Sequence, residues 1–579
     1  MSPATLVGAL VAATFLVSFG ALHYGLFTRA PLLDTPLYER YGDLIVHSGE
    51  LPYRDFAVEY PPGALPVFAA PSLFARAGDF DRYREVFELL MLLCGTSAAL
   101  LAGLVLVRRR APTVQLVTGT LLAGLAPLAL GPVVLSRFDL WPAALTVAAL
   151  AAVVTGRSRI GLALLGAAVA AKLYPAVLVP LVVAHVWRGR GRREALLSIG
   201  SGGAVVAACF APFVALAPQG VWASLHGQAT RPLQIESLGS ALLLGAHQAL
   251  GYGLVQEASH GSDNLAGALP GRLASAQGLA AAAVLLALWI GYARGPADRD
   301  RLLRYAAAAV CAFIALGRVL SPQYLMWLVP LVPLVRGRRG HAAAGLFLAT
   351  MVLTQLWFPY RYLRLVYGLD ARASWLVLAR DLVLVVLLVV LAWPARRRRV
   401  GLALGVPLLA GSLAAVAAAA LAPSARPGPM HAGVLELTGD ASSCGARAST
   451  PAATDGVAPY AVAAFRNTGP RAACVHVRVT ARGDAELFSA AYAGRFDPAS
   501  PRTGHRGDAG TCTNLAGGGA AAYSFVVPAG AGFEVEVEPC GSGPSVPPYA
   551  LVVDGGPAVV SAGGRAPATR SRPAADPPS

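Results

Sequence analysis

Charged residues are scarce in this 579-residue chain. They make up 13% of it, whereas hydrophobic residues make up 56%. Soluble domains carry roughly a quarter charged residues, so this balance excludes an ordinary soluble protein and predicts many membrane spans. The net charge of +16 does not indicate nucleic-acid binding, because the arginines stand in short clusters between apolar runs, which is the positive-inside pattern of membrane proteins.

Lysine is almost absent as well. Of the 47 basic residues only Lys172 is a lysine, and this skew, together with abundant alanine, glycine and proline, indicates the coding bias of a GC-rich genome. An ionisable residue in a membrane segment costs roughly 2.5–3.5 kcal/mol to insert and normally faces a polar cavity. Lys172 is therefore a candidate functional residue, the alternative being a lysine that extends to the outer interface.

Cysteine is also rare, with seven residues in two groups. Three of them lie in apolar segments and are expected to be inert core residues: Cys94, Cys209 and Cys311. The other four lie near the C-terminus: Cys444, Cys474, Cys512 and Cys540. An even number in a domain outside the cytoplasm predicts two disulfides, whose connectivity the sequence leaves open.

No motif indicates a metal, nucleotide or ATP site. The histidines are scattered, and neither a P-loop nor a GxGxxG before a helix occurs. We therefore expect no metal and no cofactor, and the pattern argues against a soluble nucleotide donor.

Apolar runs long enough to cross about 30 Å of hydrocarbon predict the membrane spans. They cover approximately residues 4–24, 86–107, 112–133, 139–156, 195–217, 273–293, 303–318, 322–335, 341–358, 375–393 and 400–421. The segment 160–187 has arginines on both sides, so one straight helix would place one arginine group outside. Two short helices that turn at Lys172-Leu173-Tyr174-Pro175 avoid this, because proline breaks the helix before it. The total is then about thirteen passes, with the N-terminus inside and the C-terminal region outside the plasma membrane.

The composition changes after residue 422, where Pro, Gly, Ser and Thr rise and short alternating runs appear. Residues 474–479 and 533–537 alternate with period two, which predicts an antiparallel β-sandwich. We therefore expect three parts: a transmembrane domain over 1–422, an extracytoplasmic β-sandwich over 423–561 and a disordered tail over 562–579. Tyr492, Phe496 and Tyr523 are either core residues or a platform for a sugar.

The transmembrane domain carries two long outer loops, at about 25–85 and 218–272. The first contains the run DTPLYERYGDLIVHSGELPYRDFAVEYPPG, residues 34–63, with six carboxylates and several tyrosines. Loops of this length are usually functional or disordered, and the aromatic content argues against disorder. A solvated acidic loop packed on the bundle is the alternative.

Four motifs in order resemble a known family. An Asp just after the first span with PYRDF and EYPPG, then RFDLWP at 137–142, KLYP at 172–175 and SPQY at 321–324 resemble the polyprenol-phosphate-mannose-dependent mannosyltransferases of actinobacteria. These are GT-C-type membrane glycosyltransferases, and the resemblance covers about residues 1–400. It implies an all-α membrane bundle and a catalytic Asp in the first outer loop, where Asp34 is the matching position.

The chemistry of sugar transfer agrees with a single carboxylate. Attack of a hydroxyl group on an anomeric carbon needs a base for the proton, while a lipid phosphate leaves as a stable anion and needs no general acid. Asp34 is the expected base, and Asp55 and Glu59 are its competitors, which we otherwise assign to substrate binding. The alternatives for Asp34 are an interfacial helix cap or a salt bridge.

Positive charge is the second requirement, because the departing phosphate must be stabilised. Lys172, Arg318 and Arg137 are the expected phosphate ligands. The residues expected to contact the substrates further are Tyr60, Arg231, Gln323 and Tyr324. For any one of these arginines, a surface role is the competing interpretation.

The predicted function is therefore transfer of a sugar, expected to be mannose, from a polyprenyl-phosphate donor to a glycan or glycolipid of the cell envelope, with inversion. Membrane lipids are the other expected partners. Two other classes stay open: a transporter or flippase of lipid-linked sugars, and a non-catalytic envelope scaffold. Transporters tend to contain internal repeats, and none is visible here.

Overall fold

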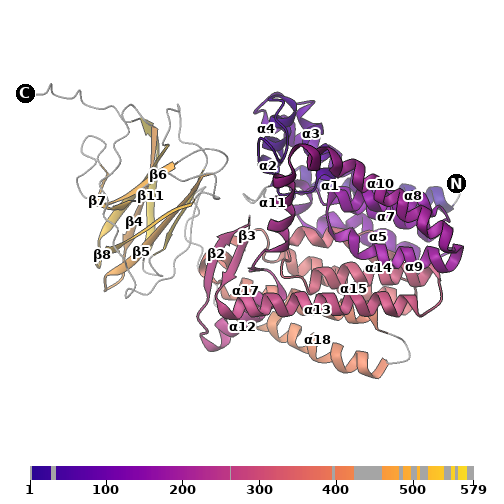
Figure 1. Cartoon of the computed structure of the whole chain (residues 1–579). Helices are drawn as coiled ribbons and strands as arrows, with labels where there is room; N and C mark the ends of the chain where they lie inside the picture. Colours follow the sequence, from indigo (N-terminus) through magenta and orange to yellow (C-terminus); the bar gives the residue numbers. More distant parts are fainter. Residues whose placement is uncertain are drawn as a thin grey trace, which may run out of the picture. The chain divides into compact units, whose positions relative to one another are not determined.

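The computed structural model describes residues 3–27, 34–260, 262–393, 398–422, 459–481, 487–496, 505–508, 520–539, 549–554 and 559–569. The chain forms two compact units (Figure 1). The first comprises residues 1–362 and 371–422, and the second comprises residues 363–370 and 423–579.

The first unit is helical. Its N-terminal half contains α1 (Pro3–His23), α2 (Thr35–Val46), η1 (Pro62–Ala64), α3 (Leu65–Ser72), α4 (Phe80–Arg108), α5 (Thr113–Leu130), α6 (Val133–Ser136), α7 (Leu140–Val154), α8 (Ser158–Ala171), η2 (Tyr174–Leu178), α9 (Val179–Arg190) and α10 (Arg192–Leu216). Its second half contains α11 (Pro218–Ala229), β1 (Leu233–Gln234), α12 (Leu238–Leu250), β2 (Val255–Ser259), β3 (Ser262–Ala266), α13 (Ala268–Ala293), α14 (Arg299–Ala315), η3 (Pro322–Trp327), η4 (Val332–Leu334), α15 (Gly337–Gln355), α17 (Ala371–Ala392) and α18 (Arg398–Leu421). The short α16 (Tyr362–Gly368) begins with the last residue of the segment 1–362, and its other residues are assigned to the second unit.

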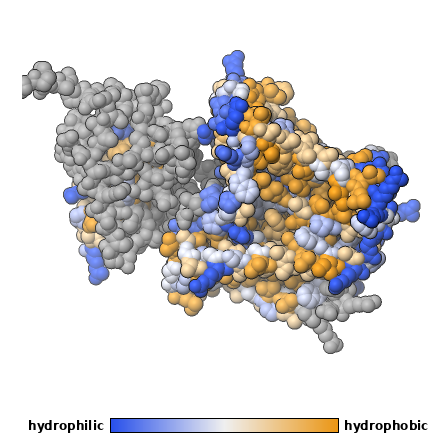
Figure 2. Space-filling model, in the orientation of Figure 1, coloured by the Kyte–Doolittle hydropathy of each residue, from blue (hydrophilic) through white to orange (hydrophobic). Residues whose placement is uncertain are grey.

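Many of these helices suit a membrane. Within the part of the chain that the structure describes, seven are long and apolar enough to cross one: α1, α4, α5, α10, α13, α17 and the stretch 403–421 of α18. Apolar side chains cover much of the visible face of this unit, and hydrophilic side chains gather toward its ends (Figure 2). The predicted polytopic membrane bundle is therefore confirmed.

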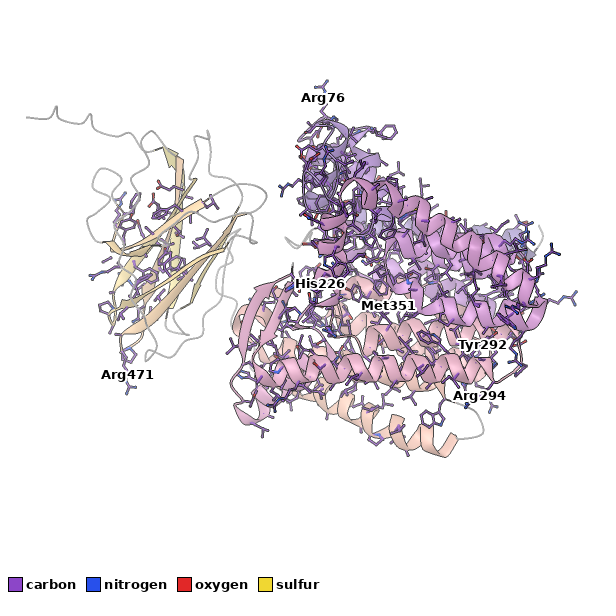
Figure 3. The ribbon with its side chains drawn as sticks, in the orientation of Figure 1. Arg76, His226, Tyr292, Arg294, Met351 and Arg471 are labelled. Atoms are coloured by element: carbon purple, nitrogen blue, oxygen red, sulfur yellow. The ribbon has the colours of Figure 1, made fainter. Side chains whose placement is uncertain are left out.

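The arginine clusters gather at one end of the bundle, where Arg294 and Tyr292 lie in Figure 3. Arg109 and Arg336 both pair with Asp300, which brings together the ends of α4, α14 and α15. The chain segments at 157–159 and 188–194 meet at this end as well, since Arg159 pairs with Glu194 at 2.8 Å. By the positive-inside rule we expect this basic end to face the cytoplasm.

The predicted hairpin is confirmed. Helix α8 ends at Ala171, Lys172 adopts extended backbone (φ −159°, ψ 140°), and the chain returns through η2 and α9. The guanidinium of Arg190, at the end of α9, lies against Gly156, just before α8, so both ends of the hairpin are at the basic end. Lys172 is therefore at the far tip of the hairpin.

One predicted span has a conformation that the sequence did not indicate. Residues 322–335 form the two 3₁₀ helices η3 and η4 instead of one α-helix. Pro322, Pro330 and Pro333 interrupt the apolar run, because each lacks the amide hydrogen that an α-helix interior needs. Hydropathy identified the burial of this segment and missed its conformation.

Both long outer loops fold. The first contains α2, η1 and α3, and the second contains α11, β1, α12, β2 and β3, with β3 pairing antiparallel to both β1 and β2. Two glycines allow the first loop to pack closely. A Cβ on Gly63 would lie 2.5 Å from the carbonyl carbon of Ala170 at the end of α8, and a Cβ on Gly220 would collide with the backbone of Tyr53.

Among its described residues the second unit contains eight strands: β4 (Pro459–Asn467), β5 (Ala473–Ala481), β6 (Leu487–Ala493), β7 (His505–Asp508), β8 (Ala520–Val527), β9 (Gly532–Pro539), β10 (Tyr549–Asp554) and β11 (Val559–Thr569). They form two antiparallel sheets, in the orders β10-β5-β8 and β11-β4-β9-β6-β7. One apolar core joins both sheets, with Val477 and Phe525 from one and Phe465 and Val535 from the other. The predicted β-sandwich is confirmed.

Three details of this unit bear on the predictions. Strand β11 pairs with β4 as far as Thr569, so the tail predicted from residue 562 begins too early. The glycines at 563 and 564 and a register shift interrupt the alternation there, which hides the strand in the sequence. Tyr492, Phe496 and Tyr523 are 1%, 2% and 6% exposed, so they are core residues. Three of the four cysteines assigned to disulfides lie outside the described residues.

Candidate functional site

Asp34 lies directly before α2, at the end of the bundle opposite the arginine clusters. It pairs with Arg137, which follows the short helix α6. The hydroxyl group of Tyr38, one turn into α2, donates to Asp34 Oδ2 at 3.3 Å. The Asp34 side chain keeps 30% of its surface exposed, whereas that of Arg137 keeps 9%. A carboxylate is thus held at the rim of the bundle with access to solvent or substrate.

Lys172 forms the second ion pair of this region. Its Nζ lies 2.7 Å from Oδ1 of Asp139, and the side chains are 15% and 1% exposed. Trp327 on η3 donates its Nε1–H to the same oxygen at 2.7 Å. The other carboxylate oxygen, Oδ2, is buried without a hydrogen-bond partner among the described residues.

Aromatic rings surround the ammonium group of Lys172. Its Nζ lies 4.6 Å from the ring centre of Phe138, 5.5 Å from that of Tyr324 and 5.4 Å from that of Trp327. Tyr174 and Tyr324 stack on Trp327 with centroid distances of 4.0 and 4.2 Å. Cation–π contacts of this kind stabilise a desolvated cation, so the cage favours a charged ammonium group at this position.

The turn at residues 137–139 joins the two pairs, because Arg137 binds Asp34 and Asp139 binds Lys172. Helices α7 and α8 have 15 and 14 residues and share the basic end at residues 154–158. At 1.5 Å per residue, both extend roughly 21 Å from that end. Asp139 and Lys172 therefore lie at similar depth, which is why residues 33 positions apart meet.

Glu59 and Tyr60 of the EYPPG motif lie next to this cluster. The ring of Tyr60 packs against Phe138 at 5.0 Å and against Tyr38 at 5.8 Å. Burial raises the pKa of Glu59, and the charge of Arg231 opposes that rise. Arg231 is also near enough to Lys172 to interact with it electrostatically. The two outer loops therefore meet at the site.

The SPQY segment extends the site on the other side. Arg318 Nη1 approaches the carbonyl of Arg231 at 3.5 Å, and Ser321 donates to Gln323 Oε1 at 2.5 Å. Tyr324, from the same segment, is part of the cage around Lys172. The structure thus places Tyr324 in the cage and Arg318 beside Arg231, while Gln323 contacts Ser321 within its own segment.

Asp55 has different contacts. Its carboxylate pairs with the neighbouring Arg54 and accepts from the amide of Leu51 at 2.7 Å, which lowers the pKa of Asp55 to about 2. These contacts stabilise the local conformation of the loop, as expected of a structural carboxylate.

The sequence motifs alone did not single out Asp139, Trp327, Phe138 or Tyr174 as site residues. Their motifs were nevertheless available, because RFDLWP contains Phe138 and Asp139 and KLYP contains Tyr174. What the sequence could not show is that these motifs meet in space. Nothing in SPQYLMW indicated that its tryptophan points to Asp139.

A second buried charged group lies nearby. The guanidinium of Arg380, on α17, pairs with Asp381 and donates to the carbonyl of Glu236 at 2.6 Å. Burial raises the pKa of Glu236 to about 8. This group holds the second outer loop on α17.

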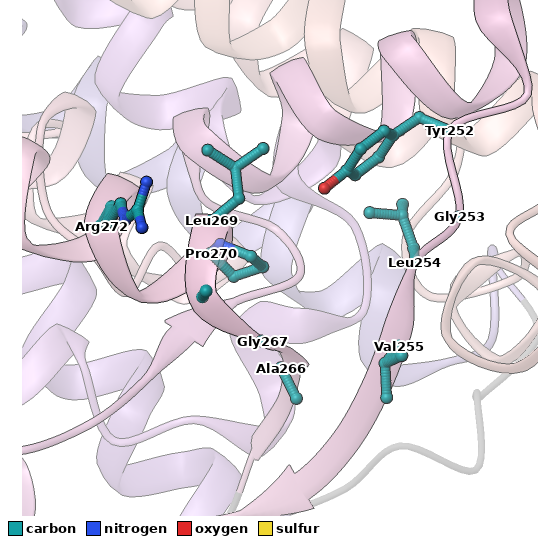
Figure 4. Close-up of a pocket in the computed structure, with 10 residues that line it drawn as sticks. Tyr252, Gly253, Leu254, Val255, Ala266, Gly267, Leu269, Pro270 and Arg272 are labelled. Atoms are coloured by element: carbon teal, nitrogen blue, oxygen red, sulfur yellow. The ribbon is translucent and has the colours of Figure 1, made fainter.

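A hollow of about 360 Å³ lies elsewhere, between the end of α12 and the start of α13 (Figure 4). It is lined by residues 252–255, 266–270 and Arg272. The predicted site residues are not among those lining it, so we do not assign the reaction to it. Among the described residues, no group of three His, Cys, Asp or Glu side chains is arranged to hold a metal ion, and a reaction without metal stays a prediction.

Residues 58–322 match the family model described as glycosyltransferase family 87. This match confirms the predicted resemblance to glycosyltransferases and leaves the sugar open. The matched region contains Lys172, Arg137, Asp139, Glu59 and Arg231, while Asp34 lies before it.

Solved structures of two membrane enzymes are distantly similar. ArnT from Cupriavidus metallidurans bound to undecaprenyl phosphate is 16% identical, with a TM-score of 0.39, and the match covers 72% of this chain and 77% of that one. Arabinosyltransferase EmbB from Mycobacterium smegmatis is 12% identical, with a TM-score of 0.32, and the match covers 98% of this chain and 64% of that one. No curated protein matches.

Proposed function

We propose that this chain, whose residues 58–322 match glycosyltransferase family 87, transfers a sugar from a polyprenyl-phosphate donor to an acceptor of the cell envelope at the outer membrane face. Mannose is the expected sugar. The observation that carries the proposal is the turn at residues 137–139. It brings a partly exposed carboxylate, Asp34, close to two deeply placed cations, Arg137 and Lys172.

The side of the membrane follows from the arginine clusters. They mark the cytoplasmic end. Lys172 lies at the other end of α8, which begins there, and Asp34 is held at the same end as Lys172 by its pair with Arg137, just before α7. A lipid-anchored phosphate at the outer leaflet therefore reaches the cluster from the membrane, and an envelope acceptor reaches it from outside. This supports a plasma-membrane enzyme that works on the outer face.

The proposed reaction is one displacement. A hydroxyl oxygen of the acceptor attacks the anomeric carbon of the donor, and the bond from that carbon to the phosphate oxygen breaks with its electron pair on the phosphate. Asp34 takes the hydroxyl proton, and the configuration at the anomeric carbon inverts. Arg137 and Lys172 stabilise the charge that develops on the phosphate, which in a site shielded from water is usually the largest contribution to catalysis.

The neighbouring residues suit the sugars. Tyr324 is the partly exposed end of a stack of three rings, and such a ring face can pack on a sugar. Glu59, Tyr60, Arg231 and Gln323 supply hydrogen-bonding groups around it. We assign Asp55 to loop structure, because its carboxylate is bound within the loop.

The test is transfer from radiolabelled polyprenyl-phosphate mannose in membranes that contain wild-type protein, Asp34→Asn or Asp43→Asn at equal levels. Asp43 is the matched control, because it lies on α2, the helix that follows Asp34, and binds Ser72 and the amide of Gly78 instead. We expect Asp34→Asn to lose at least about 100-fold in rate, which is the lower end for a general base, and Asp43→Asn to retain transfer.

Two outcomes contradict the proposal. Equal transfer by Asp34→Asn and wild type would remove Asp34 as the base. No transfer by wild type from any lipid-linked sugar would remove the enzymatic function.

A further inference from the structure

The Lys172–Asp139 pair raises a question that phosphate binding alone does not answer. A site built only to attract an anion gains nothing from a carboxylate bound to its central cation. Here the carboxylate is 1% exposed and lies 2.7 Å from Nζ. Burying a charge of the same sign as the ligand is unfavourable unless it serves the site.

The charges of substrate and product differ in the proposed reaction. A sugar linked to a polyprenyl phosphate is a phosphodiester with one negative charge. After transfer the lipid carries a phosphate monoester, with a charge of about −1.5 to −2 near neutral pH. A purely cationic site would therefore hold the product more tightly than the donor, and the product would leave slowly.

We propose that Asp139 is a positioning residue whose counter-charge on Lys172 weakens the hold of the site on the product phosphate and so permits its release. This inference rests on the proposed function. Asp139 leaves the ammonium group with free N–H donors for a phosphate while it cancels much of the excess charge. Trp327 keeps the carboxylate in place by its hydrogen bond to the same oxygen.

The surroundings favour a counter-charge over a purely structural pair. Arg137 and Arg231 both interact electrostatically with Lys172, so three cations share this region. Arg137 already has Asp34 as its partner. Without Asp139, Lys172 would be an uncompensated buried cation beside them, and a bound anion would then supply the missing negative charge.

The experiment measures binding of two lipids to purified full-length protein in detergent: farnesyl phosphate, a monoester, and methyl farnesyl phosphate, a diester. We expect Asp139→Asn to bind the monoester roughly ten- to a hundredfold more tightly than wild type, the range of one charged hydrogen bond, and to gain less for the diester. In transfer assays the same variant is expected to show a lower KM for the donor, a lower kcat and stronger inhibition by the monoester.

Matched variants separate charge from packing. Asp139→Glu keeps the charge and is expected to bind the monoester within a few-fold of wild type. Asp381→Asn makes the same change in another buried pair, with Arg380, and is expected to leave monoester affinity unchanged. In a Lys172→Gln background, Asp139→Asn is expected to leave the monoester affinity unchanged. This comparison remains informative if the single variant Asp139→Asn folds poorly.

The outcomes are distinct from those of the proposed function. Weaker binding of both lipids by Asp139→Asn, or an unchanged ratio between them, would overturn the counter-charge role. Failure of the wild type to transfer any lipid-linked sugar would contradict the proposed function. The affinities for the monoester and the diester would still test whether Asp139 acts as a counter-charge.

Discussion

Replacement of Lys172 by methionine tests the central ion pair through stability. The substitution keeps an apolar stem of similar length and removes the charge, so the carboxylate of Asp139 is left 1% exposed with only the Trp327 N–H as a donor. Removing one partner of a buried ion pair destabilises a protein by about 3–5 kcal/mol. Because the lysine side chain is 15% exposed, we expect about 3 kcal/mol, the lower end of that range.

The double variant Lys172→Met/Asp139→Asn tests whether the loss of stability comes from the unpaired carboxylate. Asparagine keeps an oxygen for Trp327 and removes the orphaned charge, so the double variant is expected to be more stable than Lys172→Met alone. Equilibrium unfolding in mixed detergent micelles, followed by tryptophan fluorescence, measures both. The matched control is Arg159→Met, which breaks an exposed pair with Glu194 and is expected to change stability by less than about 1 kcal/mol.

Two results would refute this reasoning. A loss below about 1 kcal/mol for Lys172→Met would mean that the pair behaves like an exposed one. A double variant as unstable as the sum of the two single variants would mean that the two charges are not coupled.

Two further predictions concern the first outer loop. Gly220→Ala is expected to lower transfer and thermal stability sharply, because its Cβ would collide with the backbone of Tyr53, whereas Gly227→Ala on the same helix meets no atom within 4 Å and is expected to be neutral; equal effects of both would contradict the packing. Burial, aided by nearby carboxylates, raises the pKa of Glu39 to about 7 from its ordinary 4.5, so the folded state holds this proton where the unfolded state has lost it. Stability is therefore expected to fall as pH rises from about 4.5 to 7, and Glu39→Gln should remove that part of the slope when Tm is measured between pH 5 and 8; an unchanged slope would show that Glu39 does not contribute.

The sequence predicts the parts of this protein that depend on local pattern. Arginines on both sides of residues 160–187, with a proline at 175, suffice to predict a hairpin with Lys172 at its tip. Alternation in 474–479 and 533–537 suffices to predict paired strands. Each inference needs only the chain on either side of the feature.

Features that depend on contacts between distant residues could not be predicted from the sequence. Residues 322–335 are apolar enough for a span, and only their prolines indicate that the segment is not an α-helix. The bond from Trp327 to Asp139 joins residues 188 positions apart, and no local pattern encodes it. The site could thus be predicted as a set of motifs, while the pairing of its charges could not.

The location of the lipid phosphate tests the account most directly. We suggest a cryo-EM structure of the full-length protein with an added polyprenyl phosphate. The account predicts the phosphorus within about 4 Å of Lys172 Nζ, as hydrogen bonds of about 2.7–2.9 Å to the phosphate oxygens require, with the guanidinium of Arg137 turned toward it. A phosphate bound in the hollow beside Arg272, or at the arginine-rich end of the bundle, would contradict it.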